Sequence, residues 1–508
     1  MIGFSDGSGV RSGTELGERV ARASSGLAAL GVVQGDCVAI LMRNDPVFIE
    51  ATLATQRLGA FTTPLNWQLQ AGECGYILGD CGARVLVAHM DLLAMISSVL
   101  PPGMKVIGVT TPEPLASAYG VAAEAARQAP RVPEWEEWLQ SNQPWTHEPL
   151  SAAGAMVYTS GTTGRPKGVR RSAPTDASAI AHKQHMARVF GIEPGMRSAV
   201  TGPLYHGSPN THALSTVRSG GALFIQPRFD AVGLLELIQR EKLTNLHLVP
   251  TMFVRLLKLP KEQRDCYDLS SLRFVSHAAA PCPQDVKKAM IDWWGPIFRE
   301  FYGSTETGGV TLCDSQEWLE HPGTVGKPLP GSDLIVVDDD GHRVGPGVPG
   351  EIYVRPDRVT DFSYHNLPGV RAEMERDGRI SVGDVGYLDE AGFLYLCDRK
   401  RDMVISGGVN IYPAEIEAAV LAMPGVMDCA VFGVPHSEMG ETVAAAVQLL
   451  PGATLEATDL VDWLTPRIAR YKIPRHWEFS AELPRDDTGK IFKKKLREAH
   501  WATESRRI

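Results

Sequence analysis

The sequence lacks the features that would assign it to a membrane, a secreted or a nucleic-acid-binding class. No apolar run approaches the roughly 20 residues that a membrane-spanning helix needs. The N-terminus, Met1–Asp6, has neither a basic start nor an apolar core, so no secretory signal peptide is predicted. The net charge of −9 argues against nucleic acid or an anionic membrane as the main partner, because both attract basic surfaces. We therefore expect a cytoplasmic enzyme with no transmembrane segment.

The cysteines also lack the spacing of a metal site or a disulfide framework. The chain has eight of them, and none forms a C-x-x-C pair or stands near a histidine cluster. Zinc sites need several such ligands at short spacing, so no zinc site is predicted. Reduced and mostly buried thiols are expected instead.

The first third of the chain alternates helix and strand patterns. With 508 residues it is too long for one compact core, so two or more domains are expected. Apolar residues recur at helical spacing over Leu16–Leu30, and a strand pattern follows over Cys37–Met42. Asp45–Pro46 predicts the start of a helix that continues to Leu58, and Val85–Ala88 is a further strand pattern. Strands separated by helices of this length predict parallel pairing in an α/β layered fold.

The same alternation continues through the middle of the chain. Leu246–Val249 and Leu272–Val275 are typical of buried strands. A helix is predicted over Pro283–Trp294, with Val286, Met290 and Trp293 on one face.

From about residue 323 to 355 the pattern changes to short strands separated by glycine- and proline-rich turns. Leu334–Val337 and Glu351–Val354 are two such strands, which predicts a small β-rich subdomain. After Asp398 a charged run precedes a last stretch with its own helix and strand patterns. We predict an N-terminal domain over residues 1–398, a hinge at 399–402, and a small α+β C-terminal domain over 403–508.

The segment from Thr159 to Gly168 has the composition of a phosphate-binding loop. A strand pattern over Ala155–Tyr158 runs into it, and it holds three glycines, of which two precede Lys167 and one follows it. Glycines let backbone N–H groups turn inward, and a lysine adds a point charge for phosphate. Pro166 stands where a Walker A motif requires glycine before the lysine, so a P-loop NTPase is disfavoured. A flexible Gly/Thr surface loop is the alternative interpretation.

Read whole, this segment resembles the phosphate loop of the adenylate-forming superfamily, which comprises acyl- and aryl-CoA synthetases, peptide-synthetase adenylation domains and firefly luciferases. Phe301–Gly308 resembles the second signature of that family. There Tyr302 offers a flat face to adenine, Thr305 a donor to the α-phosphate, and Glu306 a carboxylate for Mg²⁺. By itself that segment is equally typical of a capped turn that opens a helix.

Further matches follow in the family's order. Ser276–Pro281 resembles the small-residue segment lining the adenine and acyl pockets, and Asp384 the aspartate that accepts both ribose hydroxyls. Arg399 matches the arginine contacting ribose and phosphates. Arg401 stands at the family's hinge, which is most often Asp or Lys, so the freedom of the hinge is in doubt.

At the C-terminal end, Ser406–Asn410 resembles the glycine strand that closes on the pantetheine of CoA. Lys490, in the segment Pro484–Lys490, matches the catalytic lysine. Leu204–Pro209 matches the region whose histidine or aromatic residue gates the carboxylate pocket; here that residue is His206. Amino-acid-activating domains carry an aspartate near this place, so a free-standing CoA ligase is favoured.

The resemblance covers nearly the whole chain and implies a complete set of site residues. Catalytic roles are implied for Lys490, Thr305, Glu306 and His206, with Glu306 as the metal ligand. ATP contacts are implied for Thr159, Ser160, Gly161, Thr162, Thr163, Gly164, Lys167, Ala279, Ala280, Pro281, Tyr302, Gly303, Asp384 and Arg399. The implied acyl pocket comprises His206, Gly207, Thr251, Phe253, Ala278, Gly303, Gly308, Gly309 and Val310, and the implied CoA contacts are Ser406, Gly407 and Gly408.

The implied activity is an ATP- and Mg²⁺-dependent carboxylate–CoA ligase. It would make an acyl-adenylate plus pyrophosphate, then an acyl-CoA thioester plus AMP, with the C-terminal domain swinging about Arg401 between the two steps. The apolar lining of small residues favours an aromatic, cyclic or medium-chain acid. Alternatives are an adenylating enzyme that passes the acyl group to another acceptor, a luciferase- or β-lactone-type second step, and a non-catalytic nucleotide-binding homologue. The partners are small molecules, and a homodimer is implied only by analogy.

Overall fold

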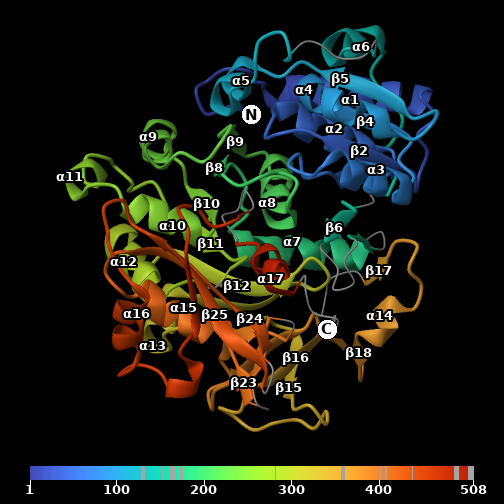
Figure 1. Ribbon diagram of the computed structural model, residues 1–508. Helices are drawn as coiled ribbons and strands as arrows, with labels where there is room; N and C mark the ends of the chain where they lie inside the picture. The colour runs from blue at the N-terminus through green and yellow to red at the C-terminus, as the bar shows by residue number, and fades with distance from the viewer. Residues whose placement is uncertain are drawn as a thin grey trace.

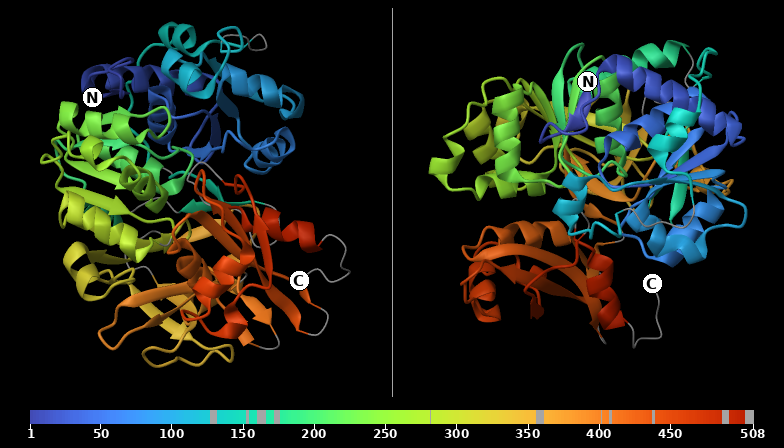
Figure 2. Two further views of the ribbon diagram at one scale, coloured as in Figure 1. Left: turned by 60° about the vertical axis from the view of Figure 1, so that its left-hand side comes forward. Right: turned by 90° about the horizontal axis from the view of Figure 1, so that it is seen from above.

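The computed structural model describes most of the chain. It covers residues 1–126, 132–151, 154–159, 166–171, 176–280, 282–355, 361–400, 402–406, 409–436, 439–485 and 491–501, with only the backbone at 176–178, 398, 399, 410 and 440. Within these residues no helix is long and apolar enough to cross a membrane. Figures 1 and 2 show the N-terminal elements gathered at one end and the C-terminal strands and helices, in orange and red, at the other.

The N-terminal part is a parallel sheet with strand order β3-β2-β4-β5. The strands are β2 (Cys37–Leu41), β3 (Phe61–Pro64), β4 (Val85–His89) and β5 (Lys105–Val109). Helices α1 (Gly13–Ala29), α2 (Pro46–Arg57), α3 (Ala71–Asp80) and α4 (Met90–Ile96) connect or cover them. The predicted helix after Asp45 is confirmed, because the Asp45 side chain accepts a hydrogen bond from the Val47 N–H and caps α2.

The second and largest sheet has eight strands in the order β1-β9-β8-β10-β11-β12-β13-β14. They are β1 (Ile2–Phe4), β8 (Arg197–Val200), β9 (Ala222–Ile225), β10 (Asn245–Leu248), β11 (Phe274–His277), β12 (Phe298–Ser304), β13 (Gly308–Asp314) and β14 (Lys327–Pro328). Pairing is parallel up to β12, and β12 and β13 then form an antiparallel hairpin. The predicted parallel α/β layering is thereby confirmed.

Helices cover both faces of this sheet. One face carries α7 (Asp176–Phe190) and α8 (Gly207–Arg218), and the other carries α9 (Ala231–Glu241), α10 (Pro250–Leu257) and α12 (Gln284–Trp294). The two faces are distinguished by alternate residues of each strand: Leu246 and Leu248 of β10 belong to the core under α9, α10 and α12, whereas His247 faces α7 and α8.

Two elements in this region differ in position from the prediction. The strand expected over Leu272–Val275 lies at Phe274–His277. Helix α12 buries Lys287, Met290, Ile291 and Trp294, while Val286 and Trp293 of the predicted face are half-buried against the same core, so the centre of the buried face is shifted from the predicted one. The reason is the ion pair between Lys287 and Glu300 in the interior, since a buried lysine breaks the apolar pattern from which a helix face is predicted.

The predicted β-rich part is present as an antiparallel sheet. β15 (Asp333–Val337) pairs with β16 (Gly350–Arg355), which also pairs with β20 (Asp384–Leu388), and β20 pairs with β21 (Leu394–Arg399). A separate three-stranded sheet joins distant segments in the order β17-β7-β6. Its strands are β6 (Val157–Thr159), β7 (Lys167–Arg171) and β17 (Phe362–Tyr364).

The last part of the chain has its own sheet and its own apolar core. Its strands are β22 (Val404–Ser406), β23 (Val409–Ile411), β24 (Val426–His436), β25 (Gly440–Leu449) and β26 (His476–Phe479), with helices α15 (Pro413–Leu421), α16 (Ala457–Leu464) and α17 (Lys493–Trp501). The predicted hinge, 399–402, begins at the last residue of β21 and ends before β22, and these two strands belong to different sheets. The domain boundary itself stays a prediction.

Candidate active site

Both ends of the predicted phosphate loop are held by one hairpin. β6 ends at Thr159 and β7 begins at Lys167, and these two residues are paired across the antiparallel strands. Residues 160–165 of the loop lie outside the described residues. The hairpin therefore fixes where the loop leaves and rejoins the sheet. The strand β6 leads into the loop, as predicted from the sequence.

Glu306, the predicted metal ligand, lies directly beside this hairpin. It occupies the turn between β12 and β13, with only 8% of its surface exposed. Its Oε1 accepts a hydrogen bond from the Tyr364 hydroxyl at 3.0 Å and is 3.4 Å from the Thr159 hydroxyl. The Lys167 ammonium lies 5.5 Å from the centre of the Tyr364 ring. Two motifs that are distant in sequence thus converge on one buried tyrosine.

Tyr364 is a residue that the sequence reasoning missed. It lies on β17, which pairs with β7. Burial, together with the neighbouring Glu306 carboxylate, raises the pKa of its hydroxyl, so Tyr364 keeps its hydrogen and donates it. No local pattern marks this tyrosine, because its role follows only from the pairing of two distant strands.

Arg171, at the end of β7, holds the turn that carries Glu306. Its guanidinium donates to the carbonyl oxygens of Thr305 and Glu306 at 2.7 and 3.0 Å. Burial lowers its pKa, while the Glu306 carboxylate acts in the opposite direction. The feature of the sequence that could have identified Arg171 is a charged residue within a strand, because a buried arginine there needs a polar partner. For the segment Phe301–Gly308, the alternative interpretation was a capped turn that opens a helix. No helix begins there, since residues 305–307 form the turn of the β12–β13 hairpin.

Two residues predicted to contact the nucleoside are hydrogen-bonded to each other. The Tyr302 hydroxyl of β12 donates to Asp384 Oδ2 at 2.7 Å, across 82 positions of sequence. Asp384 begins β20 and pairs in register with the backbone of Arg399 on β21. The structure therefore brings Tyr302, Asp384 and the main chain of Arg399 together; the Arg399 side chain lies outside the described residues.

The predicted small-residue segment, Ser276–Pro281, begins in the last two residues of β11 and contains a strained backbone. Ala279 has φ of +78°, in the left-handed region that side chains rarely adopt. Strain of this kind clusters at ligand sites, where the surrounding structure maintains it. Ala278 belongs to an apolar cluster with Met186, Val189, Phe190 and Phe301. Pro281 lies outside the described residues.

Helix α7 forms a wall of the predicted acyl region that the sequence reasoning also missed. A Cβ on Gly309 would stand 3.4 Å from the His185 ring nitrogen Nε2 and 3.5 Å from the Phe301 ring. At Gly303 a Cβ would stand 1.8 Å from the Gly308 carbonyl oxygen. Glycine is thus required at 303 by the close approach of two backbones in the β12–β13 hairpin.

Other residues of the predicted acyl pocket are divided among different surroundings. Phe253 is fully buried on the opposite face of the sheet, with its ring 5.1 Å from that of His277 and 5.5 Å from that of Phe298. Val310 belongs to the core around Tyr302 and Val169. The structure therefore separates Phe253 from Ala278 and Gly309. The prediction grouped them because it relied on their distance in sequence from the motifs, which does not show on which face of a sheet a residue lies.

His206 lies at the end of the loop that connects β8 to α8. His206 is the N-cap residue of α8, Gly207 is its first residue, and the His206 ring lies 4.4 Å from the Tyr205 ring. Thr251 is the second residue of α10, which begins at Pro250, and it is half-buried. Ser406 lies at the end of β22, and its hydroxyl contacts Met439 Sδ at 3.6 Å. Gly407, Gly408, Arg401 and Lys490 lie outside the described residues.

Two family models match the chain. The first, AMP-binding enzyme, matches residues 5–361, and the second, AMP-binding enzyme C-terminal domain, matches residues 415–490. The chain belongs to the AMP-binding enzyme family. It is 35% identical over 486 residues to a feruloyl-CoA synthase from Amycolatopsis, and the alignment covers 95% of this chain and 92% of that relative. An indoleacetate–CoA ligase from Aromatoleum aromaticum is 34% identical, with the same coverage.

The solved structures include similar two-domain enzymes. An amide bond synthetase from Marinactinospora thermotolerans superposes with a TM-score of 0.81 at 26% identity, covering 96% of this chain and 94% of that one. Together these matches confirm the predicted fold and the predicted class, an AMP-forming acyl-CoA synthetase that uses ATP and CoA. The roles of individual residues stay predictions.

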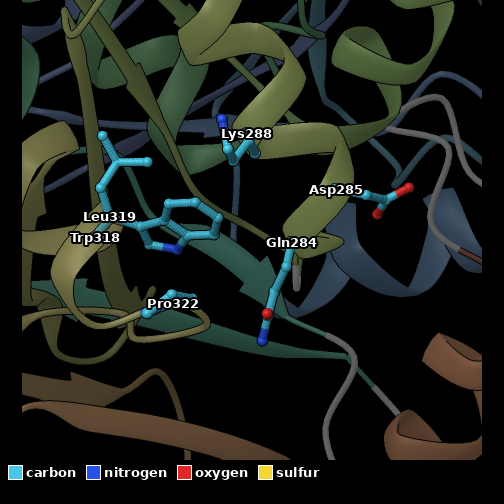
Figure 3. Close-up of a pocket in the computed structure, with 6 residues that line it drawn as sticks. All are labelled: Gln284, Asp285, Lys288, Trp318, Leu319 and Pro322. Atoms are coloured by element: carbon cyan, nitrogen blue, oxygen red, sulfur yellow. The ribbon is translucent and has the colours of Figure 1, made fainter.

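In this AMP-binding enzyme the described residues contain no group of three or more His, Cys, Asp or Glu side chains arranged to hold a metal ion. A single carboxylate, Glu306, fits a cation bound mainly through substrate phosphates, as Mg²⁺ is. A groove of about 430 Å³ lies elsewhere, between the start of α12 and the segment from Trp318 to Pro322, and the Asp285 side chain points away from Trp318 (Figure 3). None of the residues predicted to bind ATP, acid or CoA lines it.

Proposed function

We propose that this AMP-binding enzyme joins an aromatic carboxylic acid to CoA in two steps. A carboxylate oxygen of the acid attacks the α-phosphorus of ATP, and pyrophosphate leaves with the electrons of the broken P–O bond. The CoA thiolate then attacks the acyl carbon of the adenylate, AMP leaves, and the thiol proton passes to solvent. The support for an aromatic acid is the pair of relatives named for feruloyl- and indoleacetate-CoA formation, together with the Phe190 and Phe301 rings near Ala278.

The observation that carries this proposal is that the Glu306 carboxylate contacts both Thr159 and Tyr364, while Lys167 lies against the Tyr364 ring. A carboxylate and a triphosphate repel each other, so catalysis of the first step consists mainly of positioning and charge neutralisation. Glu306 would hold Mg²⁺, which neutralises phosphate charge when bound. We assign Lys167 to the leaving pyrophosphate and Thr305 to the α-phosphate.

The nucleoside half of ATP is assigned to the neighbouring pair. Asp384 has two carboxylate oxygens, and the one that already accepts from Tyr302 is held in place by that bond. The vicinal hydroxyls of ribose fit such a carboxylate. We assign Tyr302 and the residues around Ala279 to adenine, Arg399 to ribose and phosphate, and Ser406, Gly407 and Gly408 to CoA.

A panel of acids tests the proposal. Pyrophosphate release and thioester formation are measured with aromatic, cyclic and medium-chain acids, acetate and amino acids. We expect the highest kcat/KM with an aromatic acid and an acyl-CoA product that requires CoA. Peak activity with acetate or an amino acid would overturn the substrate class.

The acceptor is tested in the same assay, because the similarity to an amide bond synthetase gives the alternative a specific basis. Pyrophosphate release with an aromatic acid but no thioester in the presence of CoA, and an amide when an amine is added, would establish the alternative. Absence of ATP–pyrophosphate exchange with every acid would indicate a non-catalytic nucleotide-binding protein.

Lys490→Ala separates the two steps. A lysine that neutralises charge in the adenylating state is not needed when the thiol attacks, so adenylation should be blocked while a supplied acyl-adenylate still reacts with CoA. Arg401 is proposed as the hinge between the two states. Equal loss of both half-reactions would contradict a two-state C-terminal domain.

A further inference from the structure

Imidazole and phenyl rings gather between the large sheet and the helices α7 and α8. The His247 ring of β10 lies stacked 5.9 Å from the Phe301 ring and meets the Phe190 ring edge-on at 5.1 Å. The His212 ring of α8 lies 5.9 Å from that of His247. Four rings from four different elements thus form one cluster on a single face of the sheet.

This ring cluster is continuous with the region predicted to hold the acid. Phe190 and Phe301 belong to the same apolar cluster as Ala278. Gly309, which is also assigned to the acid, approaches both Phe301 and the His185 ring. The rings therefore lie next to residues of the predicted acyl pocket.

His247 and His212 are uncharged at neutral pH. Burial lowers the pKa of His247 to about 4 and, with the neighbouring His247, that of His212 to about 3. A neutral imidazole has one nitrogen that donates and one that only accepts. Which nitrogen accepts in His247 is decided by its neighbour on β11.

That neighbour is Ser276, whose hydroxyl lies 3.0 Å from His247 Nδ1. The Ser276 hydroxyl donates its single hydrogen to the Leu246 carbonyl oxygen at 3.4 Å. In this arrangement Nδ1 carries the imidazole hydrogen and donates it to Ser276. The lone pair of His247 Nε2 is then an acceptor.

His247 Nε2 is buried and has no hydrogen-bond partner among the residues that the structure describes. The whole residue is 5% exposed. Nε2 is the ring nitrogen farther from the backbone, so it points from β10 toward the layer of α7 and α8. A buried acceptor without a donor is destabilising, and such groups in folded proteins are commonly satisfied by water or a ligand.

We infer that His247 Nε2 accepts a hydrogen bond from an O–H or N–H group on the ring of the acid. With Phe190 and Phe301 against that ring, the site selects hydroxyaryl acids or acids with a ring N–H over the unsubstituted parent. A second carboxylate at that position would meet a lone pair and is disfavoured. The inference rests on the proposed function, because it names a preference within the aromatic acids.

The test compares each donor-bearing acid with its parent. Cinnamate is assayed against its 2-, 3- and 4-hydroxy derivatives, and indole-3-acetate against its N-methyl derivative, by pyrophosphate release. We expect the wild-type kcat/KM for the best donor-bearing acid to exceed that of its parent by roughly tenfold or more, since a site that pairs a buried acceptor rejects the analogue lacking the donor. In His247→Phe this ratio should fall to about one. His247→Gln should keep part of the preference, because its amide oxygen accepts.

His89→Phe is the matched control. His89 is equally buried, but its nitrogens already pair with the Arg43 N–H and with Asp45, in the N-terminal sheet. Its replacement should leave the ratio unchanged. If His247→Phe does not fold, the proposal is still tested by three measurements: the ratio in the wild type, the ratio in His247→Gln, and equilibrium binding of each pair of acids to the wild type.

The outcomes separate the two proposals. No preference in the wild type, or the same preference in His247→Phe as in the wild type, would overturn the role of His247 while leaving the ligase intact. Failure of every acid to release pyrophosphate would instead overturn the proposed function.

Discussion

Single side chains outside the predicted motifs position the groups inside them. Arg171 and Tyr364 are examples: one donates to the main chain of the Thr305–Glu306 turn and the other to the Glu306 carboxylate. Both lie on the three-stranded sheet that also holds the phosphate loop. The ends of the predicted phosphate loop and the Glu306 carboxylate are thereby positioned by one small sheet.

Arg171→Leu should raise KM for MgATP and lower kcat/KM by roughly ten- to a hundredfold. Two hydrogen bonds from a charged group are lost, each worth about 1.5–3 kcal/mol, and part of this is recovered when the turn rearranges. Pyrophosphate release at varied ATP measures the change. Arg170→Leu is the matched control, because the Arg170 guanidinium lies 4.2 Å from the Phe61 ring and contacts His365 instead. Equal effects of both variants would contradict the positioning role of Arg171.

Tyr364→Phe should raise the Mg²⁺ concentration needed for half-maximal activity by about three- to tenfold. The ring beside Lys167 remains, but Glu306 loses one hydrogen bond that fixes its carboxylate, which is worth about 1 kcal/mol. A magnesium titration of pyrophosphate release at saturating ATP gives the value. An unchanged titration, with activity otherwise normal, would show that Glu306 does not need this bond.

At the scale of elements, the β12–β13 hairpin carries the tightest steric requirement of the site. Gly303→Ala places a Cβ 1.8 Å from the Gly308 carbonyl oxygen, so the two strands must separate. Since Tyr302 and Glu306 lie on either side of this contact, we expect pyrophosphate release to fall more than about tenfold and the Tm to drop by several degrees. Gly345→Ala is the control, because a Cβ there meets nothing within 4 Å. Normal activity of Gly303→Ala would mean that the hairpin adapts without moving the site.

At the scale of the whole molecule, buried neutral histidines predict a loss of stability in mild acid. The folded pKa values of His212 and His247 are about 3 and 4, whereas an unfolded histidine titrates at 6.5. Below pH 6.5 the unfolded chain binds protons that the folded chain does not, so the free energy of unfolding falls as the pH falls. Above about pH 7 neither state is protonated at these groups and the effect vanishes.

Each such histidine contributes a slope approaching about 1.4 kcal/mol per pH unit. Urea unfolding between pH 7.0 and 5.5, above the range in which most carboxylates titrate, measures the summed slope. His247→Phe should reduce it by the share of one group. A free energy of unfolding that does not change over this range would contradict the folded-state pKa values.

Much of the fold could be predicted because local rules are strong where elements are regular. Asp45 before Pro46 specified the start of a helix, and alternating strands and helices specified parallel sheets. The displaced face of α12 shows the limit of these rules: the partner of Lys287 is Glu300 on another element, and a periodicity search assigns a lysine to the surface.

The sequence by itself determined the class of enzyme, because motifs that resemble those of one family follow in that family's order, and it predicted the residues assigned to phosphate, metal and ribose. Tertiary structure decided which side chains meet. It brought Thr159, Glu306 and Tyr364 together, separated Phe253 from Ala278, and left His247 Nε2 buried beside the acyl region. The physical reason is that strand pairing and the two faces of a sheet join residues whose separation in sequence carries no information about distance.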